Sequence, residues 1–176
     1  MWKPIELFND HDKINAKGGG NMKREYSVLE LSNYICSFTA EKNQPITNLH
    51  LQKILYYVQG YFLRELGTPA FAEGIYNWPY GPVVPEAYFA YNTNLSNPIT
   101  NIDQEKATEF DDRLRKDRKA YRLLHAVVDK CLGYTARQLV SMTHKEDPWK
   151  NTHQRQEIEQ PEIDKYFLLN DPLKLG

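Results

Sequence analysis

The chain has 176 residues, of which 41% are hydrophobic and 26% are charged, and its formal net charge is −1. This length fits one globular domain whose core needs no disulfides, and the composition excludes a wholly disordered chain. The balanced charge lacks the basic excess that is typical of nucleic-acid-binding proteins, so a nucleic-acid partner is not expected. The two cysteines, Cys36 and Cys131, lack the C-x-x-C spacing of zinc or redox sites. No run approaches the ~20 apolar residues that span a bilayer, so membrane insertion is not expected. We expect a cytoplasmic protein, and no residue pattern predicts a metal or a cofactor.

Residues 1–21 differ from the rest of the chain. They are polar, show little periodicity and end in the run Gly18-Gly19-Gly20-Asn21, which is typical of a flexible linker. We expect a flexible N-terminal arm over residues 1–21, a folded helical domain over residues 22–170 and a C-terminal tail over residues 171–176.

Two helices are predicted at the start of the domain. Apolar residues recur at helical spacing after Ser27, a candidate N-cap, until Asn43. A second helix begins at Thr47 or Asn48 and ends at Gly67. Its apolar residues are Leu51, Ile54, Leu55, Tyr56, Tyr57, Val58, Tyr61, Phe62 and Leu63. They surround most of the helix, so we expect it to be buried at the centre of the core.

Glycines and prolines interrupt the helical pattern between Phe71 and Pro85. A long helix cannot pass through these prolines, and the apolar residues between them have strand-like composition. We therefore predict a small inserted β-hairpin or extended loop around residues 74–84, with Pro85 as the first residue of the next helix.

The second half of the chain is predicted to be helical again. Residues 92–110 are interpreted as a connection or a weak helix, after which Asp111 or Asp112 opens a longer helix that ends at Gly133. Thr135 caps a short helix and Pro161 starts a last one. The sequence thus predicts a mainly α, single compact domain of five or six helices with one small β element.

Few residue patterns in the sequence suggest catalysis or metal binding. His144 lies near Glu146 and Asp147, and such residues transfer protons if a cleft holds them together. A polar turn between helices is the favoured interpretation of this stretch. No histidine pair has the spacing of a helical zinc site, and no nucleophile-elbow, P-loop or dinucleotide motif is present. No catalytic residue is predicted, so we do not expect an enzyme.

Two stretches are candidate contact surfaces. The segment from Trp78 to Pro85 is either a stiff corner that packs its aromatic rings into the core, which is favoured, or a preorganised surface for a partner. Basic residues gather over residues 113–122, but Asp111, Asp112 and Asp117 lie among them. A solvated helix face is favoured there over a phosphate-binding stripe, although this cluster is the best nucleic-acid candidate in the sequence.

Three stretches resemble the Panacea-domain family. They are residues 46–61 (ITNLHLQKILYYVQGY), residues 78–85 (WPYGPVVP) and residues 139–149, which end in Asp147-Pro148-Trp149. The closing segment with Ile163, Tyr166 and Phe167 is also similar. Together these stretches span about residues 26–168 in the order found in the family.

The resemblance implies a mainly helical domain with a small β element that occurs in toxin–antitoxin pairs and in phage-associated and prophage regions. There the domain binds and neutralises a cognate protein toxin, and no catalytic residues are established. The candidate partner-binding or domain-signature residues are Tyr56, Gln59, Trp78, Tyr80, Gly81, Pro82, Val83, His144, Asp147 and Trp149. Two alternatives stay open: a proteolytic adaptor that delivers a toxin to an ATP-dependent protease, and an enzyme that modifies its partner. A homo-oligomer is also open.

Overall fold

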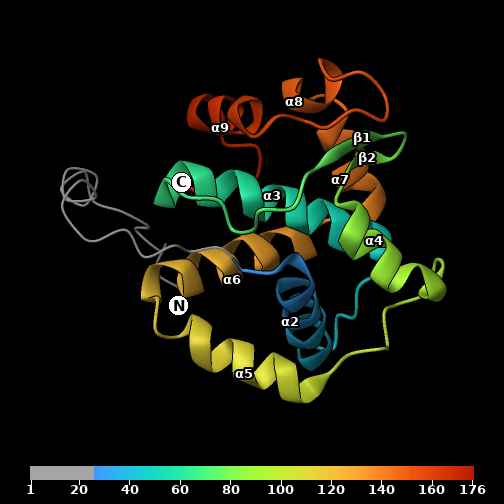
Figure 1. Ribbon diagram of the computed structural model, residues 1–176, viewed down its shortest axis with the longest axis vertical. Helices are drawn as coiled ribbons and strands as arrows, with labels where there is room; N and C mark the ends of the chain where they lie inside the picture. Colours follow the sequence, from blue (N-terminus) through green and yellow to red (C-terminus); the bar gives the residue numbers. More distant parts are fainter. Residues whose placement is uncertain (1–25) are drawn as a thin grey trace.

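The structure, a computed structural model, describes residues 26–176 (Figure 1). The elements, in chain order, are α2 (Val28–Glu41), α3 (Asn48–Leu66), β1 (Tyr76–Trp78), β2 (Gly81–Val83), α4 (Pro85–Tyr91), the short 3-10 helix η2 (Asn92–Asn94), α5 (Gln104–Leu114), α6 (Arg118–Leu132), α7 (Ala136–Thr143), α8 (Asp147–Lys150) and α9 (Gln160–Leu169). The predicted mainly α fold with a small inserted hairpin is confirmed. The arm predicted over residues 1–21 lies outside the described residues.

Helix α3 forms the centre of the fold, as its sequence predicts. Every residue from Leu51 to Leu63 is buried. In Figure 1, α8 and α9 lie on one side of α3, and α2, α5 and α6 lie on the other. Phe167 of α9 packs directly on Gly60, where an added Cβ would lie 2.3 Å from the ring. The glycine therefore allows α9 to approach α3 closely.

The helix starts follow local signals in most cases. Thr47 accepts a hydrogen bond from His50 N at 3.3 Å, and Thr135 forms a capping box at the start of α7. Pro85 is the first residue of α4. Ser27 occupies the N-cap position of α2, but its side chain makes no capping bond. Instead, Glu73 Oε1 accepts from Val28 N at 3.1 Å, so a distant side chain caps this helix.

The region between α4 and α7 corrects one prediction. The sequence analysis placed one long helix from Asp111 or Asp112 to Gly133, but the structure has two helices separated by a turn at residues 115–117. Asp103 caps α5 and Asp117 caps α6 through side-chain hydrogen bonds. Helix α5 was predicted only as part of a connection or weak helix over residues 92–110, because it buries only Ala107, Phe110 and Leu114, which is too few to show a clear period.

The C-terminal residues 171–176 pack against α3. Tyr61 OH donates to Asp171 Oδ1 at 2.5 Å and accepts from Leu173 N at 3.0 Å. Leu173 is fully buried. The last residues therefore complete the core beside the C-terminal half of α3.

The β-hairpin is short and antiparallel. Tyr76 pairs with Val83 and Trp78 pairs with Gly81. Strand β1 also forms an isolated bridge from Tyr76 to Glu157, so a loop after α8 adds a third partner at this edge. The hairpin thus lies between α3 and the segment that follows α7.

Candidate functional site

Glutamine side chains of α3 bind the backbone of residues 70–84. Gln59 Oε1 accepts from Ala70 N and Phe71 N at 2.9 and 3.3 Å, and Gln59 Nε2 donates to Phe71 O at 3.0 Å. Gln52 Oε1 accepts from Val84 N at 2.9 Å. These bonds satisfy buried backbone groups that a two-stranded sheet leaves without ladder partners. They also fix the hairpin's position on the helix.

Lys53 adds a buried cation to this contact. Its Nζ donates to Pro82 O at 2.7 Å, and no ion pair joins it to a carboxylate within residues 26–176. Burial lowers the pKa of Lys53 from 10.5 to about 7, because the charged ammonium is disfavoured away from water. Gly81 lies beside it with φ +98°, and an added Cβ would lie 2.8 Å from Nζ. Glycine therefore permits both the turn and the lysine.

Glu146 joins the segment after α7 to the same helix. Its carboxylate accepts from Tyr56 OH at 2.9 Å and from Tyr57 OH at 2.8 Å. Burial raises the pKa of Glu146 to about 7, and the two hydroxyl donors act in the opposite direction. The carboxylate therefore holds the start of α8 against the middle of α3.

Side chains of the hairpin and α8 bind each other. Trp149 Nε1 donates to Trp78 O at 3.1 Å. Asn77 Nδ2 donates to Trp149 O at 2.7 Å and to Thr152 O at 2.8 Å. Residues 52–59, 70–84 and 143–152 are thus connected pairwise by hydrogen bonds, and we term this unit the three-segment lock.

Three aromatic rings gather where the hairpin meets α4, two of them half-buried, and a fourth ring lies at the hairpin turn. The Trp78 ring lies 5.0 Å from Tyr88 and 6.3 Å from Phe89, in edge-to-face geometry. Phe89 is 60% exposed, and Tyr80, at the hairpin turn, is 70% exposed. We term Trp78, Tyr80, Tyr88 and Phe89 the aromatic platform. Large rings held on a fixed backbone lose little entropy when they are covered, which suits them to bind a protein partner.

Comparison with protein families matches residues 51–150 to the family described as "Antitoxin SocA-like, Panacea domain". The chain belongs to this family. The match begins within α3 and ends with α8, so it includes the hairpin and the platform. This Panacea domain is 35% identical over 71 residues to Antitoxin SocA of Caulobacter vibrioides (strain NA1000 / CB15N). The aligned residues make up 40% of this chain and 38% of that relative. The alignment thus spans well under half of the relative's length. No solved structure matches.

The ten candidate residues of the Panacea domain all lie in or beside the lock, but their surroundings differ. Tyr56, Gln59, Gly81, Pro82 and Val83 are buried; Trp78, His144 and Trp149 are partly exposed; Tyr80 and Asp147 are exposed. Sequence reasoning considered Glu146 only for proton transfer and missed its role as a buried acceptor for α3, and it missed Phe89 as a candidate. No local signal could have identified them. In the sequence, Glu146 looks like any acidic residue in a polar turn, and Phe89 looks like any aromatic residue on a short helix.

His144 does not form the hypothesised proton-transfer pair. Its ring stacks on Trp149 at 4.0 Å, and its Nε2 is buried without a hydrogen-bond partner among the described residues. Burial lowers the pKa of His144, and the Lys53 charge lowers it further. Glu146 binds two tyrosines, and the 65% exposed Asp147 side chain pairs with Lys150. In this Panacea domain the His144 ring thus packs against Trp149 and is not paired with a carboxylate.

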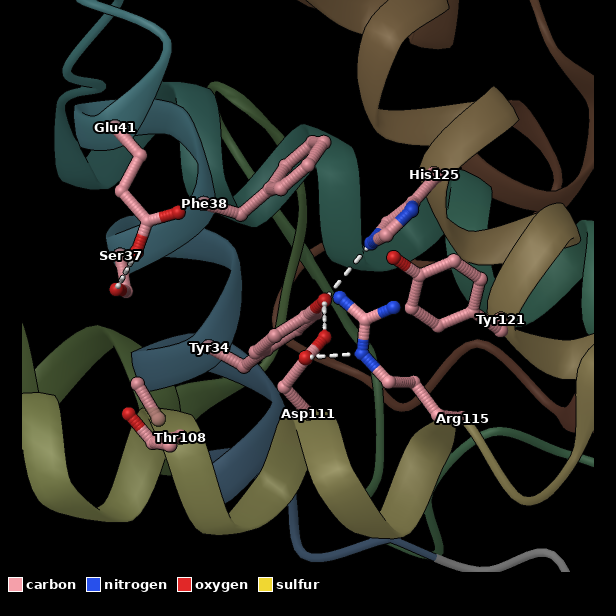
Figure 2. A pocket seen from close by; sticks show the side chains of 10 residues that line it. Tyr34, Ser37, Phe38, Glu41, Thr108, Asp111, Arg115, Tyr121 and His125 are labelled. Carbon is pink, nitrogen blue, oxygen red and sulfur yellow. Dashed lines mark hydrogen bonds and ion pairs between the residues drawn. The ribbon is translucent and has the colours of Figure 1, made fainter.

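A second candidate is a cavity of about 200 Å³ between α2, α5 and α6. Figure 2 shows Tyr34, Asp111, Arg115 and His125 pointing toward one another at its wall. Tyr34 OH donates to Asp111 Oδ1 at 2.7 Å, and Arg115 Nε donates to Asp111 Oδ2 at 2.5 Å. Burial raises the pKa of Asp111, but these hydrogen bonds outweigh it and hold the pKa below its usual value.

The same network indicates the tautomer of His125. The Tyr34 hydroxyl has one proton, which goes to the charged Asp111, so His125 Nε2, 2.8 Å away, must be the donor to Tyr34. Burial lowers the pKa of His125. The polar groups of this cavity thus satisfy one another, which makes it a weaker ligand-site candidate than the exposed platform.

None of the helices in residues 26–176 combines the length and apolar character needed to cross a membrane. Within the same residues, no three His, Cys, Asp or Glu side chains are placed to hold a metal ion together.

Proposed function

We propose that this chain, a member of the antitoxin family, neutralises a cognate protein toxin by direct contact through the aromatic platform. One observation carries the proposal. The backbone of the hairpin is held by the buried Lys53 of α3 and the half-buried Trp149 of α8, while the Tyr80 ring at its turn is 70% exposed. The fold thus fixes the backbone of the hairpin while the rings of Tyr80 and Phe89 stay exposed.

The energetics favour such a surface for protein binding. Interfaces take most of their binding energy from a few residues, among which tyrosine and tryptophan are enriched. Side chains that are already held in place lose less freedom on association. Because Tyr80 and Phe89 are largely exposed, they contribute little to folding, so their substitution separates binding from stability.

The test is co-expression with the neighbouring gene as the candidate toxin. The wild-type chain should restore growth and form a stoichiometric complex by size-exclusion chromatography. The double variant Tyr80→Ala/Phe89→Ala should lose both properties while keeping its urea unfolding midpoint. Leu169→Ala serves as the matched control, because Leu169 is 76% exposed on α9, outside the platform. It should behave as wild type.

Three other outcomes would contradict the proposal. A complex that survives the double variant would place the toxin on another surface. Growth restored without a complex, and only in cells that contain an ATP-dependent protease, would indicate a proteolytic adaptor. Growth lost on His144→Ala while the complex persists would indicate an enzyme that modifies the toxin.

A further inference from the structure

The corner where α5 meets α6 concentrates positive charge. Residues 113–122 carry one acidic residue, Asp117, against six basic ones: Arg113, Arg115, Lys116, Arg118, Lys119 and Arg122. The whole chain has a net charge of −1, so this excess is local. Figure 1 shows the α5–α6 connection at an outer edge of the molecule.

Two of the three nearby carboxylates, those of Asp111 and Asp117, are already engaged within the protein. Asp117 Oδ1 accepts from the backbone N of Lys119 and Ala120 at 3.2 and 3.1 Å, which caps α6. Asp111 accepts from Tyr34 OH and from Arg115 Nε. Asp111, Asp112 and Asp117 were the reason for expecting a neutralised helix face. Asp117 is used by the helix cap and Asp111 neutralises only Arg115, while Asp112 is exposed and joins no ion pair within residues 26–176.

Three of the cations are left to face solvent. Lys116, Arg118 and Arg122 are exposed, and no ion pair joins them to a carboxylate within residues 26–176. By contrast, Arg113 pairs with Glu30 at 3.0 Å. The exposed cations therefore form a surface that is free to attract an anion.

This arrangement works against folding. Helix α6 has no acidic residue in its first turn and opens with Arg118 and Lys119, although cations at a helix N-terminus oppose the helix dipole. Arg118 and Arg122 are four residues apart on the same helix, where like charges repel. The Asp117 cap offsets part of the first effect. An anionic partner would relieve what remains of both effects, and a local conflict of this kind is typical of a functional surface.

We propose that the α5–α6 corner binds the phosphodiester backbone of nucleic acid through Lys116, Arg118 and Arg122. Arginine forms paired hydrogen bonds to phosphate oxygens, and backbone contacts of this kind need no base sequence. None of the exposed large hydrophobic side chains lies between residues 104 and 132. Protein interfaces have apolar centres from which charge is depleted, so this charged surface without an apolar anchor suits phosphates better than a protein.

The experiment measures binding of the full chain to a labelled 20-base-pair DNA duplex of arbitrary sequence, and to an RNA duplex of the same length, by fluorescence anisotropy. Three phosphate contacts give a log–log salt slope of about −2.7, which is about a 40-fold loss of affinity between 50 and 200 mM salt. The triple variant Lys116→Ala/Arg118→Ala/Arg122→Ala should bind at least tenfold more weakly at 50 mM salt, with a slope near zero.

The matched control removes the same charge elsewhere. Arg137, Lys145 and Lys165 are exposed outside the corner, and their triple alanine variant should keep the wild-type slope. Urea midpoints confirm that both variants fold. Comparing the DNA and RNA arms identifies the nucleic acid, and equal binding to both supports recognition of the backbone alone.

The proposal is overturned if neither duplex binds at 50 mM salt, or if both triple variants lose affinity equally. It is also overturned if the corner variant leaves nucleic-acid binding intact and weakens the toxin complex, since that would assign the corner to an acidic protein surface. Restoration of growth against the toxin should be unchanged in the corner variant, so failure here is distinguishable from failure of the proposed antitoxin mechanism.

Discussion

Replacing Lys53 with methionine should change how the stability of the domain depends on pH. The side chain is fully buried, and burial lowers its pKa from 10.5 to about 7. Between these two values the unfolded chain binds one proton more than the folded chain. Stability therefore rises with pH across this window, and the full cost of burying the ammonium applies below pH 7.

The magnitude follows from 1.36 kcal/mol per pKa unit, which gives about 5 kcal/mol over the window and about 3 kcal/mol between pH 7 and 9.5. Methionine has a similar length and no charge, so it removes this dependence. It also leaves Pro82 O without its donor, at a cost of about 1–3 kcal/mol. We therefore expect Lys53→Met to be more stable than wild type by about 2–4 kcal/mol at pH 7, and less stable near pH 10.5.

The assay is urea unfolding followed by tryptophan fluorescence at pH 7, 8, 9 and 9.5. Buried cysteines and tyrosines titrate in both proteins, so the difference between wild type and variant isolates Lys53. Lys165→Met is the control, because Lys165 is exposed, and its difference from wild type should be flat. Parallel stability curves for wild type and Lys53→Met would show that burial does not neutralise the lysine, and would refute the reasoning.

Two further variants test the packing around α3. The folded pKa of Glu146, about 7, lies above its ordinary 4.5, so wild type should lose about 3 kcal/mol as pH rises from 4.5 to 7. Glu146→Gln should abolish this loss in urea unfolding over that range, and a constant difference from wild type would contradict it. Gly60→Ala would place a Cβ 2.3 Å from Phe167 and should cost about 1–3 kcal/mol. An unchanged urea midpoint would mean that α9 moves away from α3 freely.

The sequence predicted the elements whose signals are local. Helix α3 has a dense apolar pattern, a threonine cap and a terminal glycine in the left-handed conformation, so its position and its burial were both readable. The prolines before α4 likewise forced a break and placed its first residue at Pro85. In each case the information lies within one or two turns of the chain.

Contacts between distant residues were not readable in this way. Val28 N is capped by Glu73, 45 residues away, so no motif near α2 could have predicted this cap. Glu146 lies among polar neighbours in the sequence, and only the approach of Tyr56 and Tyr57, about 90 residues earlier, makes it a buried acceptor. The sequence did not predict that Tyr80 is exposed while its neighbours are buried. A rigid corner packed into the core and an exposed contact surface have the same composition.

The two buried ionisable groups of the lock oppose folding most strongly near neutral pH. Lys53 carries its full cost below pH 7, and Glu146 carries its full cost above it. Apolar residues of similar size would avoid these costs, but they would leave Pro82 O and the hydroxyls of Tyr56 and Tyr57 without these partners. Each buried charged group therefore has its hydrogen-bond partner only when a distant segment lies in one particular position. Shifting the hairpin along α3 would leave Lys53 buried without its acceptor, so the buried charge disfavours every register except the one that presents Tyr80 at the turn.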